Sequence, residues 1–239
     1  MFDTIILLAG SAERAKLSIL LKRFNQRLAV HAVGTLGDLE ALEPALLRRA
    51  RLIGFLTPVI VPSHILDRLG FGAYNFHPGP PSYPGWQPAY FAAYEGATAF
   101  GATAHAMVAK VDAGPIIDVE LFKVPPNATV VDLEKMAFVE AAHLFRRLSP
   151  LLATRPAPLP DLPIRWGARK STRKQFAAMC DIPLDISKEE LERRIAVFGA
   201  VPIGVYPTVM LHGHRFRLVP EPAALEEAIS PSLVPDLVA

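Results

Sequence analysis

The chain has 239 residues, of which 51% are apolar and 20% charged, and its formal net charge is +2. Such a chain can bury a sizeable core, and a charge so near zero gives no reason to expect a nucleic-acid or membrane partner. The single cysteine, Cys180, excludes an internal disulfide and fits a reducing compartment. We expect it in the core rather than as a nucleophile. No apolar run is long enough to span a membrane, and the N-terminal residues lack the features of a signal peptide, so we expect a cytoplasmic protein.

The N-terminal part of the chain alternates apolar runs with segments of helical periodicity. The apolar runs are typical of strands buried on both faces, and they cover residues 4–10, 28–33 and 52–56. The helical segments cover residues 12–24, 38–49 and 60–69. We expect Ser11 to cap the first helix and Pro44 to break the second. This order predicts an α/β fold with a Rossmann-like open sheet. Gly10 lacks the glycine spacing of a dinucleotide fingerprint, which disfavours NAD.

Further elements follow in the middle of the chain. A helix is expected over residues 86–94, strands over 101–110 and 115–122, and a long helix over 129–148. Thr129 and Asp132 have the spacing of a capping pair at the start of that long helix. These elements complete the expected N-terminal domain.

A cluster of prolines after the long helix predicts a domain boundary near residue 150. The expected divisions are a catalytic domain over 1–150, a proline-rich linker over 151–165, a small α+β segment over 166–222 and a tail over 223–239. The small segment should hold a helix opened by Ser187 and a β-hairpin over 206–218.

The most informative stretch of the sequence runs from Gly72 to Pro81, where proline and glycine end a short predicted strand. Asn75 and His77 are two residues apart and should face the same side of that strand. The ends of strands are where α/β proteins bind ligands. Asp112 lies in a later Asp-Ala-Gly turn. An amide, an imidazole and a carboxylate suit acyl transfer, since they can stabilise an oxyanion and move a proton. The same residues are also typical of tight turns, and their spacing alone leaves both interpretations open.

The two motifs decide between these interpretations through a resemblance. Asn75-x-His77-Pro78, followed by Val111-Asp112-x-Gly114-Pro115, is similar to the signature of the formyltransferases that use 10-formyltetrahydrofolate. That family includes glycinamide ribonucleotide, methionyl-tRNA and amino-sugar formyltransferases. The resemblance covers residues 51–150, and it implies the N-terminal fold of those enzymes with a small C-terminal appendage. It also implies that Asn75, His77 and Asp112 are the catalytic set.

The resemblance implies contacts for both substrates. The folate co-substrate would be contacted by Phe55, Leu56, Thr57, Val108 and Gly114. The acceptor would be contacted by Gly10, Ser11, Pro78, Tyr83, Trp86 and His105. No metal is implied. Formyl transfer would proceed through a tetrahedral intermediate without an acyl-enzyme, with Asn75 and protonated His77 stabilising the oxyanion. Asp112 would hold His77 or an ordered water.

The expected activity is transfer of a formyl group to a primary amine of a small metabolite, with a nucleotide-linked amino sugar as the expected acceptor. A methionyl-tRNA acceptor is the alternative, and a non-catalytic or formate-releasing folate-binding relative is a further one. The segment ahead of Asn75 is shorter than in the methionyl-tRNA enzymes, and the loop after His77 also differs, so acceptor specificity is expected to differ. A homodimer formed through the C-terminal hairpin is possible.

Several residues allow two interpretations from the sequence. His105 fits the site or a satisfied core position, and Tyr83 and Trp86 fit acceptor stacking or support of the proline loop. His212 and His214 fit a solvated turn better than a metal site. A basic run could grip phosphate or tRNA, although a solvated face is favoured. The run comprises Arg165, Arg169, Lys170, Arg173 and Lys174.

Overall fold

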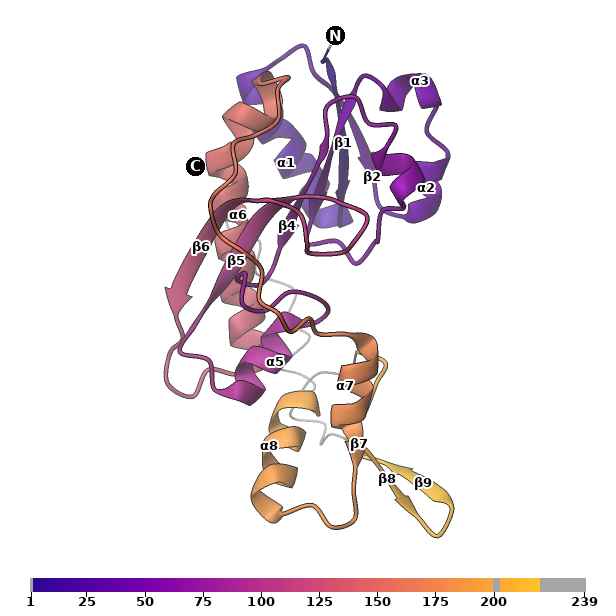
Figure 1. The fold of residues 1–239 in the computed structure, drawn as a ribbon, viewed down its shortest axis with the longest axis vertical. Coiled ribbons are helices and arrows are strands. Elements are labelled where there is room, and N and C mark those ends of the chain that lie inside the picture. The colour runs from indigo at the N-terminus through magenta and orange to yellow at the C-terminus, as the bar shows by residue number, and fades with distance from the viewer. Residues whose placement is uncertain (1, 200–202, 220–239) are drawn as a thin grey trace.

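The computed structural model describes residues 2–199 and 203–219, so the expected tail over 223–239 lies outside the described residues. A six-stranded sheet dominates the N-terminal two thirds of the chain (Figure 1), and its strand order is β2-β1-β3-β4-β5-β6. The strands are β1 (Thr4–Ala9), β2 (Ala29–Val33), β3 (Ala50–Phe55), β4 (Ala73–His77), β5 (Ala99–Ala106) and β6 (Ile116–Lys123). β1 to β4 pair in parallel, whereas β5 and β6 are antiparallel to their neighbours. The mixed α/β fold predicted from the sequence is confirmed.

Helices cover both faces of the sheet. They are α1 (Ser11–Phe24), α2 (Leu36–Glu40), α3 (Pro44–Leu47), α4 (Ser63–Leu66), α5 (Pro88–Glu95) and α6 (Val130–Thr154). Alternate residues of β1 belong to two separate cores: Ile5 and Leu7 pack toward α1 and α6, and Ile6 and Leu8 pack toward α2, α3 and α4. A strand sandwiched in this way must be apolar at every position, which is why its sequence is a continuous apolar run.

The boundaries of the first helices differ from the sequence prediction. Gly10 occupies the N-cap of α1 in an extended conformation, so Ser11 is the first helical residue and does not cap. The predicted 38–49 helix is two short helices, because Thr35 opens the first with a capping box and Pro44 opens the second. The predicted 60–69 helix is the single turn α4, with Pro62 at its N-cap.

Helix α6 is longer than predicted. The capping pair at its start is confirmed, with Thr129 and Asp132 bonded to each other's backbone. Its end near residue 148 is wrong, because the helix continues through Pro150 to Thr154. Leu152 and Ala153 are completely buried, so packing of the last turn outweighs the loss of one backbone hydrogen bond at the proline.

The C-terminal part adds α7 (Arg173–Cys180), α8 (Lys188–Phe198) and a three-stranded sheet. The strands are β7 (Asp181–Ile182), β8 (Thr208–Leu211) and β9 (His214–Arg217), in the order β7-β8-β9. The hairpin and the helix capped by Ser187 are confirmed, whereas α7 and β7 were not predicted. Phe176 and Phe198 pack against α5, and Cys180 is buried beside them as expected. The division into domains stays a prediction. No helix among the described residues is long and apolar enough to cross a membrane.

Candidate active site

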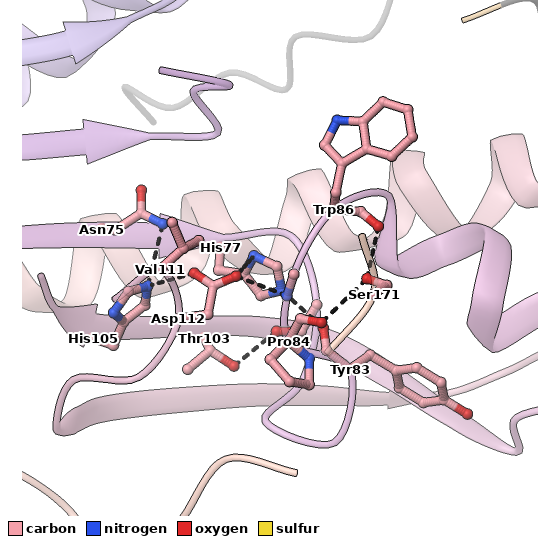
Figure 2. A network of polar contacts seen from close by, with 12 residues as sticks. Asn75, His77, Tyr83, Pro84, Trp86, Thr103, His105, Val111, Asp112 and Ser171 are labelled. Atoms are coloured by element: carbon pink, nitrogen blue, oxygen red, sulfur yellow. Dashed lines mark hydrogen bonds and ion pairs between the residues drawn. The ribbon is translucent and has the colours of Figure 1, made fainter. Parts of the chain in front are cut away.

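The candidate site lies at the carboxyl end of β4, where the parallel part of the sheet meets the antiparallel part. Asn75 and His77 belong to this strand, and antiparallel β5 brings His105 directly opposite Asn75. Asp112 lies in the turn between β5 and β6. Figure 2 shows Asn75, His105, Asp112 and His77 joined in one chain of polar contacts. Two stretches that are about 30 residues apart in sequence therefore meet at one point.

The turn that carries Asp112 has a steric reason for its sequence. Asp112 adopts a left-handed conformation with φ of 42°, which aspartate tolerates better than most residues. At Gly114, a Cβ atom would lie only 2.0 Å from the carbonyl oxygen of Ala106, so no side chain fits there. The Asp-x-Gly pattern thus turns the chain sharply against β5 and points the Asp112 carboxylate back toward β4.

The Asp112 carboxylate faces both histidines. Oδ1 lies 3.2 Å from His105 Nε2, and Oδ2 lies 3.6 Å from His77 Nδ1. Oδ2 also accepts a hydrogen bond of 2.8 Å from the backbone N–H of Gly85. Burial alone would raise the pKa of Asp112. The hydrogen bond from His105, the electrostatic attraction to the two histidine rings and the Gly85 N–H together lower that pKa to about 2. The carboxylate is therefore ionised near neutral pH.

His77 is held in its neutral form. The side chain is buried, and its Nε2 lies 3.0 Å from the carbonyl oxygen of Tyr83, to which it donates. Burial lowers the pKa of His77 more than the nearby Asp112 raises it. Because Nε2 carries the hydrogen, Nδ1 faces Asp112 with a free lone pair. The protonated His77 expected from the resemblance does not match this resting state.

Asn75 carries an unsatisfied group. Its amide nitrogen lies 3.2 Å from His105 Nε2. Its Oδ1 is buried and, among the described residues, has no hydrogen-bond partner. Gly54 on the neighbouring strand leaves space for this amide, since a Cβ there would lie 2.9 Å from Asn75 Oδ1. A buried polar atom without a partner is costly in a purely structural position, so a ligand is its natural partner.

A cavity of about 550 Å³ opens beside this cluster. Asn75, His77, His105 and Asp112 lie on one side of it. Its other walls are mainly apolar, and they are formed by Leu56, Pro58, Val59, Ile60, Val61, Leu66, Met107, Val108 and Val111. Ile60 is 66% exposed at this cavity. Mainly apolar walls with a few convergent polar groups are typical of a small-molecule site.

The structure brings part of the expected contact set to this cavity. Residues at the cavity are Leu56, Thr57, Pro78, Trp86, His105 and Val108, together with the expected catalytic set. Others lie elsewhere: Phe55 is buried in the core, Gly114 packs on β5, and the Tyr83 side chain packs on Phe100. Gly10 and Ser11 are exposed at the end of β1 and are not among the residues that line the cavity.

The segment after the prolines returns to the site, which the sequence did not reveal. Trp166 stands edge-on to both histidines, 5.8 Å from the ring of His77 and 5.0 Å from that of His105, and donates to the carbonyl of Gly114. Lys170 donates to the carbonyl of Val111 beside Asp112. Arg173 lines the cavity with its guanidinium over the Trp86 ring. The only sequence feature that pointed here was the basic run.

The structure also places the remaining residues for which the sequence allowed two interpretations. Arg165, Arg169 and Lys174 of the basic run are exposed. His212 and His214 are exposed at the tip of the β8–β9 hairpin. Among the described residues, no group of three histidine, cysteine or acidic side chains is arranged to hold a metal.

Comparison with known proteins shows the same fold. A sugar N-formyltransferase from Shewanella superposes with a TM-score of 0.70 at 14% identity, covering 90% of this chain and 96% of that one. An N-formyltransferase from Helicobacter canadensis, solved with folinic acid and dTDP-3-aminofucose, gives 0.63 at 15%, covering 89% and 85%. Methionyl-tRNA formyltransferase from Clostridium thermocellum gives 0.57 at 16%, covering 90% of each chain. Residues 52–148 match the formyl transferase family model.

Proposed function

We propose that the protein transfers a formyl group from 10-formyltetrahydrofolate to a primary amine of a nucleotide-linked amino sugar. The observation that carries the proposal is the meeting of Asn75, His77 and Asp112 at one side of a mainly apolar cavity, within the segment that matches the formyl transferase family model. The sequence places these three side chains in two separate motifs, and the sheet brings them together.

The cavity fits the proposed co-substrate. Its apolar walls, from the loop after β3 and the loop after β5, suit a flat ring system, and the Asn75 amide, whose Oδ1 has no partner among the described residues, lies at the cavity as a polar anchor. 10-Formyltetrahydrofolate, when bound, supplies the formyl carbon for transfer. Leu56, Thr57 and Val108 would hold it between the two loops.

The chain's own residues supply the remaining chemistry. The Asn75 amide donates a hydrogen bond to the formyl oxygen, which becomes negative as the amine adds. His77 Nδ1, with its lone pair free, receives the proton from the attacking amine. Asp112 then stabilises the resulting imidazolium, because its Oδ2 already lies 3.6 Å from that nitrogen. His77 finally returns the proton to the leaving group.

No residue at the cavity serves as a covalent nucleophile for an acyl-enzyme. Cys180 is buried in the core between α5, α7 and α8, and burial raises the pKa of its thiol to about 11. Direct transfer to the amine follows.

Other residues of the cavity wall suit the acceptor. Trp86 supplies an aromatic ring with the Arg173 guanidinium over it, and Arg173 and Lys110 supply positive charge. A nucleotide-linked sugar carries both a flat base and phosphates, which are the partners that aromatic rings and guanidinium groups bind. Similar proteins support the same class: the Helicobacter canadensis enzyme was solved with dTDP-3-aminofucose.

The test is loss of 10-formyltetrahydrofolate, followed by absorbance, with dTDP- and UDP-linked amino sugars, methionyl-tRNA or water as acceptor. We expect turnover with an amino sugar, and a loss of roughly 100-fold or more in kcat for Asn75→Ala, since an oxyanion donor is removed. Gln26→Ala, an exposed amide far from the cavity, is the control.

Each other result would replace the proposal with a defined alternative. Turnover with methionyl-tRNA alone would indicate the tRNA enzyme. Formate release in water at an unchanged rate would indicate a hydrolase, and folate binding without turnover on any acceptor would indicate a binding protein. Near wild-type turnover of Asn75→Ala would remove Asn75 from the mechanism.

A further inference from the structure

His105 is fixed between Asn75 and Asp112. Its side chain is buried, with 3% of the residue exposed, and it lies opposite Asn75 in the β4–β5 pairing. Trp166 packs edge-on against the ring at 5.0 Å. Strand register and packing therefore set the position of the ring, and the atoms that face its two nitrogens identify its hydrogens.

Both ring nitrogens of His105 face oxygen atoms that can only accept. Nδ1 lies 2.9 Å from the carbonyl oxygen of Ala106, so Nδ1 carries a hydrogen. Nε2 lies 3.2 Å from Oδ1 of Asp112, an ionised carboxylate to which a hydrogen on Nε2 would donate. An imidazole ring with hydrogens on both nitrogens is a cation.

The cation determines the orientation of the Asn75 amide. An N–H₂ group cannot donate to a nitrogen that already carries a hydrogen, so the Asn75 oxygen must face His105 Nε2. The two orientations of an amide have the same shape, and hydrogen-bond partners decide between them. A half-turn of the amide places its oxygen on His105. The N–H₂ group then takes the place where the oxygen has no partner, beside Gly54 and Thr57.

We propose that His105 is a positioning residue: as an imidazolium it pairs with Asp112 and turns the N–H₂ group of Asn75 toward the formyl oxygen. The catalytic consequence rests on the proposed formyl transfer, whereas the charge and the orientation do not. One positive charge then balances one carboxylate in the cluster, and it resides on His105 rather than on His77.

A neutral His105 satisfies the cluster less well. With a hydrogen on Nδ1 alone, Nε2 would accept from the Asn75 amide and turn its lone pair toward the Asp112 carboxylate at 3.2 Å. The Asn75 oxygen would stay buried without a donor. The charged form removes the mismatch at Asp112, because one N–H shared between two acceptors is an ordinary three-centre hydrogen bond. It also turns the Asn75 N–H₂ group, rather than the oxygen, toward the position that has no partner among the described residues.

The first test needs no substrate. Nitrogen-15 NMR of histidine-labelled protein at about pH 8, above the ordinary titration range of histidine, reads the hydrogens on each ring. His105→Gln and His77→Gln assign the two rings by loss of signal, and His143→Gln, at an exposed helix position, is the control. We expect two protonated nitrogens on His105 and one on His77. A bare Nε2 on His105 would overturn the proposal, whatever the enzyme turns out to formylate.

The second test separates positioning from a general structural role. His105→Leu should lower kcat by roughly 100-fold with little change in the KM for the folate. His105→Gln keeps a donor toward Asn75 and Asp112 and should stay within about tenfold of wild type. If His105 acts through Asn75, the double variant Asn75→Ala/His105→Leu should be no more than about twofold slower than Asn75→Ala. Losses that multiply in the double variant would show that His105 does not act through Asn75.

Discussion

The sheet buries polar groups at both ends, and the two sets are satisfied very differently. Near the amino end of β3, Arg51 is completely buried, and its guanidinium donates to the carbonyls of Phe71, Leu152 and Arg155 at 2.7 to 3.1 Å. It also lies over the ring of Phe2. At the opposite end of the same strand, Gly54 opens onto Asn75, whose oxygen has no partner in the part of the chain that the structure describes.

The difference separates a structural polar group from a functional one. Arg51 supplies hydrogens to the carbonyls that the end of α6 leaves free, so the chain itself satisfies the charge and no ligand is needed. The cluster of Asn75, His77, His105 and Asp112 is satisfied only in part, and its unsatisfied group lies beside the cavity. Substitutions at the two ends should therefore affect different properties: stability at Arg51 and turnover at the cluster.

The largest expected effect is on stability at Arg51. Arg51→Met fills a similar volume but leaves several buried carbonyls without donors, and we expect it to lower the free energy of unfolding by about 3–5 kcal/mol. Kinetic constants of the protein that remains folded should be unchanged. Urea unfolding measures the free energy of unfolding, and the formyl transfer assay measures the kinetic constants. Arg49→Met is the matched control, since the Arg49–Asp3 pair is exposed and should contribute at most about 1 kcal/mol. Equal losses for both arginines would refute the assignment of Arg51 as the structural group.

An intermediate effect is expected on the stability of the fold at acidic pH, through Asp112. The pKa of Asp112 is lowered from 3.8 to about 2 in the folded protein, so its ionised form stabilises the fold above pH 4. That contribution, about 2 kcal/mol, should be lost as the pH falls from about 5 to 2. Urea unfolding of wild type and Asp112→Asn as a function of pH isolates it, because the other carboxyls titrate alike in both. A stability gap that stays constant across that range would show that Asp112 has no lowered pKa.

The smallest expected effect concerns the space beside Asn75. In Gly54→Ala the new methyl group would lie 2.9 Å from Asn75 Oδ1 and 2.7 Å from Met107 Cε. The flexible Met107 end can move, whereas the amide is displaced, so kcat should fall about tenfold. Gly37→Ala is the control, because its nearest neighbouring atom would be 3.8 Å away. Unchanged turnover in Gly54→Ala would mean that the amide does not need its present position.

Local pattern was sufficient for most of the sheet. β1 and β3 are buried on both faces and therefore read as continuous apolar runs, and the Thr129–Asp132 pair marked the start of α6 without any tertiary information. The end of α6 was missed because Pro150 is a local signal against a helix, whereas the burial of Leu152 and the contact with Arg51 are made by residues about 100 positions away.

By itself, the sequence determined the α/β alternation and the two motifs that carry Asn75, His77 and Asp112, because strand periodicity and turn chemistry depend on neighbouring residues. Only the tertiary structure decided which groups meet. It placed His105 opposite Asn75 through β-sheet register, and it brought Trp166, Lys170 and Arg173 back across the site from beyond the prolines. It also left Phe55 and Gly114 in packing positions. The strand register and the path of the segment after the prolines are set by contacts between residues that are distant in sequence, and no local sequence pattern records such contacts.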